Sequence, residues 1–211
     1  NLRQSGVKTH GVETFDGSSG IAVITVCQAD NQIILDRGAN EKLSPEEIDR
    51  ITTEIAAQID DDYRDSGKRL LLLCILKGSV VFMGDLMKKI ERPVEIDFMK
   101  VSSYGSGTSS SGKINIMLDL HRADMANLDV IVVEDIIDSG RTLSYLVDYL
   151  KLTGARSVKT CTMLDKPDRR VVNFEPDYVG KIIPDEFVVG YGLDYDEKYR
   201  TLPFIGVLKK E

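Results

Sequence analysis

The chain has 211 residues, of which 42% are hydrophobic and 29% are charged, and its formal net charge is −7. These values are ordinary for a globular protein of about one domain, and they exclude a disordered, collagen-like or disulfide-scaffold chain. The acidic balance also argues against nucleic acid or an anionic membrane as the main partner, because both favour a basic surface.

The three cysteines, Cys27, Cys74 and Cys161, are widely spaced and form no CxxC pair. A disulfide framework or a zinc site is therefore not expected, and a reducing compartment such as the cytoplasm fits this pattern. The longest unbroken apolar run, at residues 70–76, is much shorter than the roughly 20 residues that span a bilayer. We therefore expect a cytoplasmic protein with no membrane association.

The first predicted elements are a strand at residues 21–27 and a helix that begins after Ser44. Ser44, Pro45 and Glu47 supply an N-cap, a proline at the first helical position and a capping-box glutamate. The apolar face of this helix consists of isoleucines spaced by three or four residues: Ile48, Ile51, Ile55 and Ile59.

The rest of the chain alternates between predicted strands and helices. Helical periodicity predicts helices at residues 80–90 and about 142–152. Strands are expected at residues 70–76, 94–101, 113–118, 130–133, 158–164, 178–183, 187–191 and 204–208. Residues 102–112 are almost wholly Ser, Gly, Thr and Tyr, which is typical of a mobile loop. This alternation predicts an α/β fold, a parallel twisted sheet with helices on both faces.

Ligands of such sheets bind beyond the carboxyl ends of the strands, and the segment after residues 130–133 is unusual there. It contains two adjacent carboxylates, Glu134 and Asp135, then Asp138, and then a small-residue loop that enters a helix. The N–H groups and hydroxyls of such a loop suit a phosphate monoester, and the paired carboxylates suit vicinal hydroxyls or a divalent cation. The segment therefore indicates a ribose 5-phosphate site; the alternative is an N-capped helix with solvated carboxylates.

Residues 132–143 resemble the ribosyl-pyrophosphate motif of the type I phosphoribosyltransferases. Further segments resemble the hypoxanthine-guanine branch of that family: residues 76–79, 101–105, 164–167, 183–195 and 199–208. The resemblance runs from about Leu43 to the C-terminus. It implies a phosphoribosyl-pyrophosphate-binding core at residues 41–164, a purine-binding hood at residues 165–211, and an N-terminal extension of unassigned role at residues 1–40.

The resemblance also implies an activity. The family transfers the phosphoribosyl group of phosphoribosyl pyrophosphate to a purine base, with Mg²⁺ as the cofactor. The expected enzyme is thus a pentosyltransferase of purine salvage that converts hypoxanthine or guanine to IMP or GMP and releases pyrophosphate. The family is commonly dimeric or tetrameric, so the resemblance implies a homo-oligomer.

By the same resemblance, Asp138 is the catalytic base toward purine N7. The ribose hydroxyls and the metal are held by Glu134 and Asp135, with Asp194 near a second metal ion. The 5-phosphate contacts the loop residues Asp138, Ser139, Gly140, Arg141 and Thr142. The pyrophosphate contacts Lys77, Gly78, Ser103, Tyr104 and Arg200. The purine contacts Lys166, Phe187, Val188 and Asp194.

The implied purine contacts have a chemical reason. Lys166 would donate a hydrogen bond to the 6-oxo group and so reject adenine, because adenine presents a donor at that position. Phe187 would stack on the base while the backbone of Val188 reads its edge. In the family the peptide bond before Lys77 is often cis, and the loop that begins at Ser103 and Tyr104 closes over the site.

Two alternatives remain at this point. One is a regulatory protein on the same fold that senses phosphoribosyl pyrophosphate and binds nucleic acid, although the acidic charge speaks against it. The other is a transferase for xanthine or a pyrimidine, which keeps the mechanism and changes the base. Lys181 and Ile182 stand where relatives more often carry an aromatic and an acidic residue, which leaves the subunit contacts of the hood open.

Overall fold

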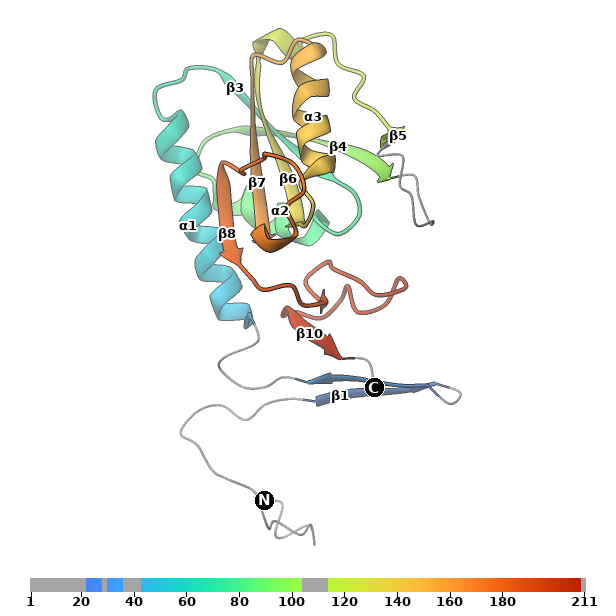
Figure 1. The fold of residues 1–211 in the computed structure, drawn as a ribbon. Coiled ribbons are helices and arrows are strands. Elements are labelled where there is room, and N and C mark those ends of the chain that lie inside the picture. The colour runs from blue at the N-terminus through green and yellow to red at the C-terminus, as the bar shows by residue number, and fades with distance from the viewer. Residues whose placement is uncertain (1–21, 28–29, 36–42, 104–113, 210–211) are drawn as a thin grey trace, which may run out of the picture.

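The computed structural model of the chain describes residues 22–27, 30–35, 43–103 and 114–209. Its centre is a six-stranded sheet with the order β5-β4-β3-β6-β7-β8, in which every neighbouring pair is parallel except β4 and β5 (Figure 1). These strands are β3 (Arg69–Ile75), β4 (Val94–Ser103), β5 (Ile114–Leu118), β6 (Leu128–Ile137), β7 (Ser157–Asp165) and β8 (Tyr178–Ile182). The strands expected at residues 94–101 and 113–118 form β4 and β5, which pair antiparallel.

Helices cover both faces of this sheet, which confirms the predicted fold class (Figure 1). The helices are α1 (Pro45–Tyr63), α2 (Val80–Lys89) and α3 (Arg141–Leu152), and two short 3₁₀ helices, η1 (Met125–Asn127) and η2 (Pro167–Arg169), lie in the connections. Helix α1 starts with the predicted capping box: the Ser44 N–H donates to Glu47 at 3.0 Å, and the Glu47 N–H donates to the Ser44 hydroxyl at 3.2 Å. None of the described helices is both long enough and apolar enough to cross a membrane.

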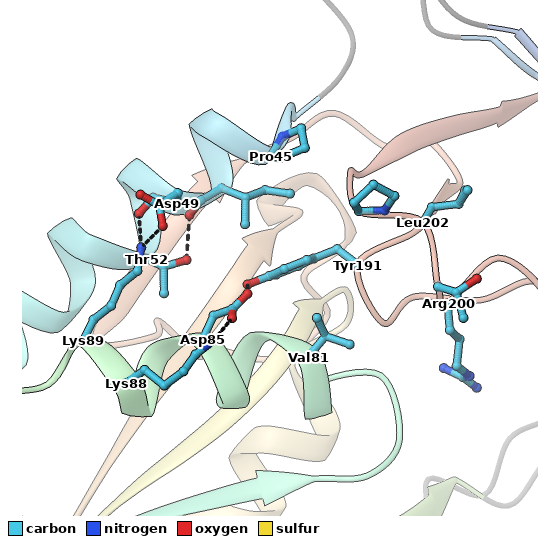
Figure 2. A pocket seen from close by; sticks show the side chains of 13 residues that line it. Pro45, Asp49, Thr52, Val81, Asp85, Lys88, Lys89, Tyr191, Arg200 and Leu202 are labelled. Atoms are coloured by element: carbon cyan, nitrogen blue, oxygen red, sulfur yellow. Dashed lines mark hydrogen bonds and ion pairs between the residues drawn. The ribbon is translucent and has the colours of Figure 1, made fainter.

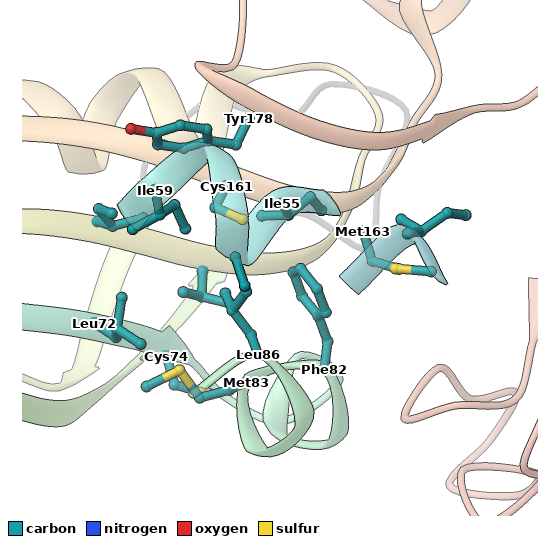
Figure 3. Packing of buried hydrophobic residues seen from close by; sticks show 14 of the residues in the cluster. Ile55, Ile59, Leu72, Cys74, Phe82, Met83, Leu86, Cys161, Met163 and Tyr178 are labelled. Carbon is teal, nitrogen blue, oxygen red and sulfur yellow. The ribbon is translucent and has the colours of Figure 1, made fainter. Parts of the chain in front are cut away.

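Strand β3 divides the core between the two faces because its side chains alternate. Leu70, Leu72 and Cys74 pack with α1 and α2, whereas Leu71 and Leu73 pack with α3. Figure 3 shows the first of these clusters, in which isoleucines of α1 and side chains of α2 pack together on one face of the sheet. A strand covered on both faces needs an apolar residue at every position, which explains the unbroken apolar run.

A second, four-stranded antiparallel sheet joins the two ends of the chain in the order β1-β2-β10-β9. Its strands are β1 (Ala22–Cys27), β2 (Asp30–Leu35), β9 (Val188–Val189) and β10 (Gly206–Lys209). The sequence predicted β1 but not β2. A bridge between Leu43 and Ile205 ties this sheet to the start of α1. Strand β8, which lies within residues 165–211, belongs to the central sheet.

Candidate active site

The carboxylate pair lies inside strand β6 rather than after it. We expected the strand to end at residue 133, but it pairs with β7 as far as Ile137, opposite Asp165. Neighbouring residues of a strand point to opposite faces of the sheet. Glu134 lines a cavity at the start of α3, and Asp135 lines an adjoining cavity that also contains Lys166 and Phe187.

The first compartment is a cavity of about 140 Å³ where β6 turns into α3. It is lined by Glu134, Ile136, Ile137, Asp138, Ser139, Gly140, Thr142 and Leu143. The N-cap of α3 is Gly140, which has a φ of 77° and no side-chain capping bond. The Arg141 N–H, at the first position of α3, donates to the Ser139 hydroxyl at 3.4 Å, and the adjoining cavity at this N-terminus can hold an anion.

The second compartment is a cavity of about 250 Å³ beside the first. It is lined by Asp135, Ile136, Asp138, Lys166, Phe187, Val188, Leu193 and Asp194. Ile136 and Asp138 line both cavities, so the two compartments adjoin at these residues. All four residues predicted to contact a purine lie around the second cavity.

Lys166 and Asp138 meet between the carboxyl ends of β7 and β6. The Lys166 side chain is only 7% exposed, and its Nζ lies 3.5 Å from Oδ1 of Asp138. Phe187 is half exposed, and its ring forms a T-shaped pair with the ring of Tyr195, the ring centroids being 5.7 Å apart. A half-exposed aromatic ring on a cavity wall offers a free face for stacking, whereas a core phenylalanine would not.

The two strand carboxylates resist ionisation. Loss of hydration, reinforced by the charge of Asp135, raises the pKa of Glu134 well above its usual range. Loss of hydration likewise raises the pKa of Asp135 to about 6. Among the described residues, Oε2 of Glu134 is buried and has no hydrogen-bond partner. Such an atom is costly to leave alone, so these carboxylates suit a ligand that brings positive charge or hydroxyl donors.

Gly78 connects the turn after β3 to the second cavity. A β-carbon on Gly78 would lie 1.5 Å from Oδ2 of Asp135, so only glycine fits against that carboxylate. On the other side, a β-carbon on Gly192 would lie 2.0 Å from the Gly78 carbonyl oxygen. The peptide bond between Leu76 and Lys77 is cis, as the resemblance implies.

Charged side chains lie next to Gly78 and Gly192. Arg200 donates to the Gly192 carbonyl at 2.7 Å and pairs with Asp194 at 2.8 Å. Glu197 pairs with Arg200 at 3.2 Å and with Lys77 at 2.8 Å, and so links two of the predicted pyrophosphate residues. The sequence analysis missed Glu197, because only the folded chain brings it next to Lys77.

Arg141, Ser103 and Tyr104 are the remaining predicted site residues. Arg141 is exposed at the first position of α3, and Ser103 ends β4. Tyr104 lies outside the described residues. Arg141 lines neither the cavity of 140 Å³ nor the cavity of 250 Å³.

A larger cavity of about 370 Å³ lies between α1, α2 and residues 191–203 (Figure 2). In it the Tyr191 hydroxyl donates to Asp85 at 2.8 Å, and Lys89 pairs with Asp49 at 2.6 Å. Arg200 is the one predicted site residue on its wall, as far as the described residues go. Asp138 and Lys166 are absent from this wall, so the cavity is separate from the predicted general base and from the predicted 6-oxo contact.

Comparison with known proteins agrees with this geometry. Residues 43–196 match the model of the phosphoribosyl transferase domain family. The chain is 54% identical over 168 residues to a hypoxanthine-guanine phosphoribosyltransferase of Streptococcus thermophilus, covering 80% of this chain and 92% of the relative. A relative of the same name from Streptococcus mutans is 53% identical over the same length, 80% of this chain and 92% of that protein.

A solved structure agrees as well. The crystal structure of a hypoxanthine phosphoribosyltransferase from Staphylococcus aureus superposes with a TM-score of 0.76 at 48% identity, covering 81% of this chain and 91% of that one. The family model covers more than half of the chain, and the relatives span most of it at high identity. The chain therefore belongs to the phosphoribosyltransferase family, in its hypoxanthine-guanine branch.

Proposed function

We propose that the chain transfers the 5-phosphoribosyl group of phosphoribosyl pyrophosphate to hypoxanthine or guanine, giving IMP or GMP and pyrophosphate. Membership of the family makes it an enzyme, a phosphoribosyltransferase of purine salvage. The observation that carries the detailed proposal is the pair of adjoining cavities with Asp138 and Ile136 on their shared wall. A nucleoside monophosphate has the same layout, with a phosphate at one end, a base at the other and ribose between them.

At the phosphate end, the loop from Asp138 to Thr142 binds the 5-phosphate through its backbone N–H groups and hydroxyls. The positive end of the α3 dipole favours the same anion. At the other end, the Phe187 ring stacks on the purine and the Val188 backbone reads its edge. Lys77, Gly78 and Arg200 hold the pyrophosphate, and Ser103, Tyr104 and Arg141 complete the anion contacts.

The chemical step joins purine N9 to C1′ of the ribose as the bond from C1′ to pyrophosphate breaks. Positive charge develops on the ribose during this exchange, and the carboxylates of Glu134 and Asp135 stabilise it. The N7 proton of the purine passes to the carboxylate of Asp138, which is the general base. Lys166 donates to the 6-oxo group. Because Lys166 lies close to Asp138, the two side chains can contact the same purine, one at the 6-oxo group and the other at N7.

The donor set also fits a magnesium ion. Glu134 has a buried oxygen without a partner among the described residues. The pKa values of Glu134 and Asp135 are raised, and a bound cation would stabilise their ionised forms. No group of three or more metal-ligating side chains forms within the described parts of the chain. That is compatible with Mg²⁺, which keeps several waters and uses substrate oxygens as ligands. We propose that Glu134 and Asp135 would hold this ion and that Asp194 would lie near a second one; when bound, the metal neutralises the leaving pyrophosphate.

We also propose a homodimer or homotetramer in the cytoplasm. The cytoplasmic location is supported by Cys74 and Cys161, which are both free and buried as in proteins of reducing compartments. The oligomer rests on the family resemblance. Neither a nucleic-acid partner nor a membrane is proposed, because the net charge of −7 disfavours both.

The test is a pyrophosphate-release assay with phosphoribosyl pyrophosphate and Mg²⁺, run in parallel with hypoxanthine, guanine, xanthine, adenine and uracil. We expect release with hypoxanthine and guanine, and none after EDTA is added. Release only with xanthine or uracil would replace the proposed base. Binding of phosphoribosyl pyrophosphate without release for any base would favour the regulatory alternative.

A further inference from the structure

Arg170 contacts the backbone of the proposed 5-phosphate loop, residues 138–142, although nothing in its sequence context singled it out. It follows η2, and its side chain is only 11% exposed. The guanidinium reaches three segments: Nε donates to the Phe174 carbonyl at 3.0 Å, Nη1 donates to the Asp138 carbonyl at 2.7 Å, and Nη2 pairs with the carboxylate of Asp165. A rigid fork with three separate acceptors fixes their relative positions.

Val171, the residue after Arg170, also binds the backbone of this loop. The Val171 N–H donates to the Ser139 carbonyl at 3.1 Å. Two consecutive carbonyls of the loop, those of Asp138 and Ser139, are thus bound from the side of residues 170–171. In a planar trans peptide the carbonyl and the N–H point in opposite directions. The N–H groups of Ser139 and Gly140 therefore point away from Arg170, and both residues line the cavity of 140 Å³.

The Arg170 side chain packs closely against Gly140. A β-carbon on Gly140 would lie 2.7 Å from Cδ of Arg170, and Gly140 has a φ of 77°. The other end of the support is the central sheet, because Asp165 ends β7 and is 3% exposed. Arg170 thus connects a rigid strand end to the back of the loop.

We propose that Arg170 is a positioning residue that aims the N–H groups of Ser139 and Gly140 at the 5-phosphate by holding the carbonyls of Asp138 and Ser139 on the opposite side. The inference deepens the proposed function and rests on its phosphate site. Arg170 itself touches no substrate, so its loss weakens the phosphate end of the site and leaves the purine end intact.

The structure offers a matched control at the far end of the same sheet. Arg156 pairs with Asp129 at 2.9 Å, and Asp129 is 1% exposed, so this pair also neutralises a buried carboxylate. Asp129 lies near the start of β6, whereas Asp165 ends β7. Removing either arginine takes the charged partner from a buried carboxylate, although Asp129 keeps its hydrogen bond from Ser157, and only Arg170 adjoins the loop.

The experiment compares Arg170→Met, Arg170→Lys and Arg156→Met for melting temperature, for the KM of phosphoribosyl pyrophosphate and hypoxanthine, and for the affinities of IMP and inosine. We expect Arg170→Met to raise the KM of phosphoribosyl pyrophosphate about tenfold or more, as for one lost charged hydrogen bond, with the KM of hypoxanthine within about twofold. IMP should weaken by a similar factor while inosine, which lacks the phosphate, does not. Arg156→Met should lower only the melting temperature.

Arg170→Lys separates positioning from charge compensation, and it carries the test if Arg170→Met fails to fold. Lysine can neutralise Asp165, but it lacks the fork that also holds the Asp138 carbonyl. We expect a near-normal melting temperature with the raised KM. A normal KM in Arg170→Lys, or equal weakening of IMP and inosine in Arg170→Met, would overturn the proposal. A wild-type enzyme that binds no IMP would contradict the proposed function instead.

Discussion

Gly78 lies directly against the carboxylate of Asp135, so that a β-carbon at position 78 would be 1.5 Å from Oδ2. Real β-carbons do not come this close to another atom, and the Gly78 carbonyl is blocked on its other side by Gly192. The turn after β3, the strand carboxylate and the C-terminal loop are therefore packed as one unit around a residue without a side chain.

Gly78→Ala tests this packing. We expect the variant to lose about a hundredfold in kcat/KM, because the methyl group must displace Asp135 or the turn by about 1 Å or more. Gly84→Ala is the matched control: Gly84 lies in α2 with nothing within 4 Å of a built β-carbon. It should keep full activity and gain about 0.5–1 kcal/mol of stability. Equal activity of the two variants would contradict the role of the Gly78 contact.

Asp138→Asn tests the general base. Its side chain is 47% exposed, so the variant should melt at the wild-type temperature. We expect kcat to fall by about 10²–10⁴-fold, because an amide cannot accept the N7 proton. Asp185→Asn serves as the control, since Asp185 is similarly exposed and pairs with Arg169, which also lies 3.9 Å from Asp138. Wild-type turnover in Asp138→Asn would exclude the base assignment.

Lys166→Met tests the reading of the 6-oxo group. Methionine keeps the length of the buried side chain but removes its donor, so hypoxanthine loses a hydrogen bond and adenine no longer meets a second donor. The ratio of kcat/KM for hypoxanthine over adenine should fall by at least about tenfold. Lys181→Met, at an exposed lysine of β8, should leave that ratio unchanged. An unchanged ratio in Lys166→Met would assign the selectivity elsewhere.

Glu134→Gln tests whether the strand carboxylate is held at a cost in stability. The pKa of Glu134 is raised in the folded chain, so as pH rises above the ordinary value of 4.5 the unfolded state ionises first and the folded state loses stability. A neutral glutamine avoids this loss. Without ligands, we expect a higher melting temperature at pH 7, by about 2–4 °C for each kcal/mol recovered, and a gain that vanishes below about pH 4.

Activity should move in the opposite direction. Glu134→Gln should lose most turnover, because the amide cannot stabilise positive charge on the ribose or hold a cation. The exposed Glu91 provides the control, and Glu91→Gln should change neither melting temperature nor rate. A lower melting temperature for Glu134→Gln at pH 7 would show that the ionised carboxylate is already stabilised by the folded chain.

Local chemistry was sufficient to predict most of the fold. The capping box at Ser44 and Glu47 marks the start of α1 because both partners lie within four residues of each other. The apolar run of β3 predicts a strand buried on both faces because each of its positions meets a core. Both features depend on neighbouring residues, which a single sequence displays directly.

The missed features depend on distant partners. Strand β2 begins with the polar residues Asp30, Asn31 and Gln32, and it is defined by pairing with β1 and with β10 at the far end of the chain. Strand β6 continues past its apolar residues because β7 pairs with it as far as Asp165.

In the candidate site too, some contacts could be predicted from the sequence and others could not. The proximity of Lys166 to Asp138 could be predicted, because both follow the carboxyl ends of neighbouring parallel strands. Arg170 could not, since its partner is a backbone carbonyl 32 residues away that has no sequence signature. Glu197 was missed for a similar reason, because its contact with Lys77 spans 120 residues.

The position of β10 has a consequence for the order in which the protein forms during translation. The central sheet is complete once Ile182 has been made, and its mostly local crossover connections allow it to fold early. Val188, on the wall of the cavity of 250 Å³, belongs to β9, which among the described strands is held by β10 alone. Residues 206–209 must therefore be translated before this cavity can close, and a nascent chain that stops before Gly206 has the loop at residues 138–142 but an unfinished second cavity.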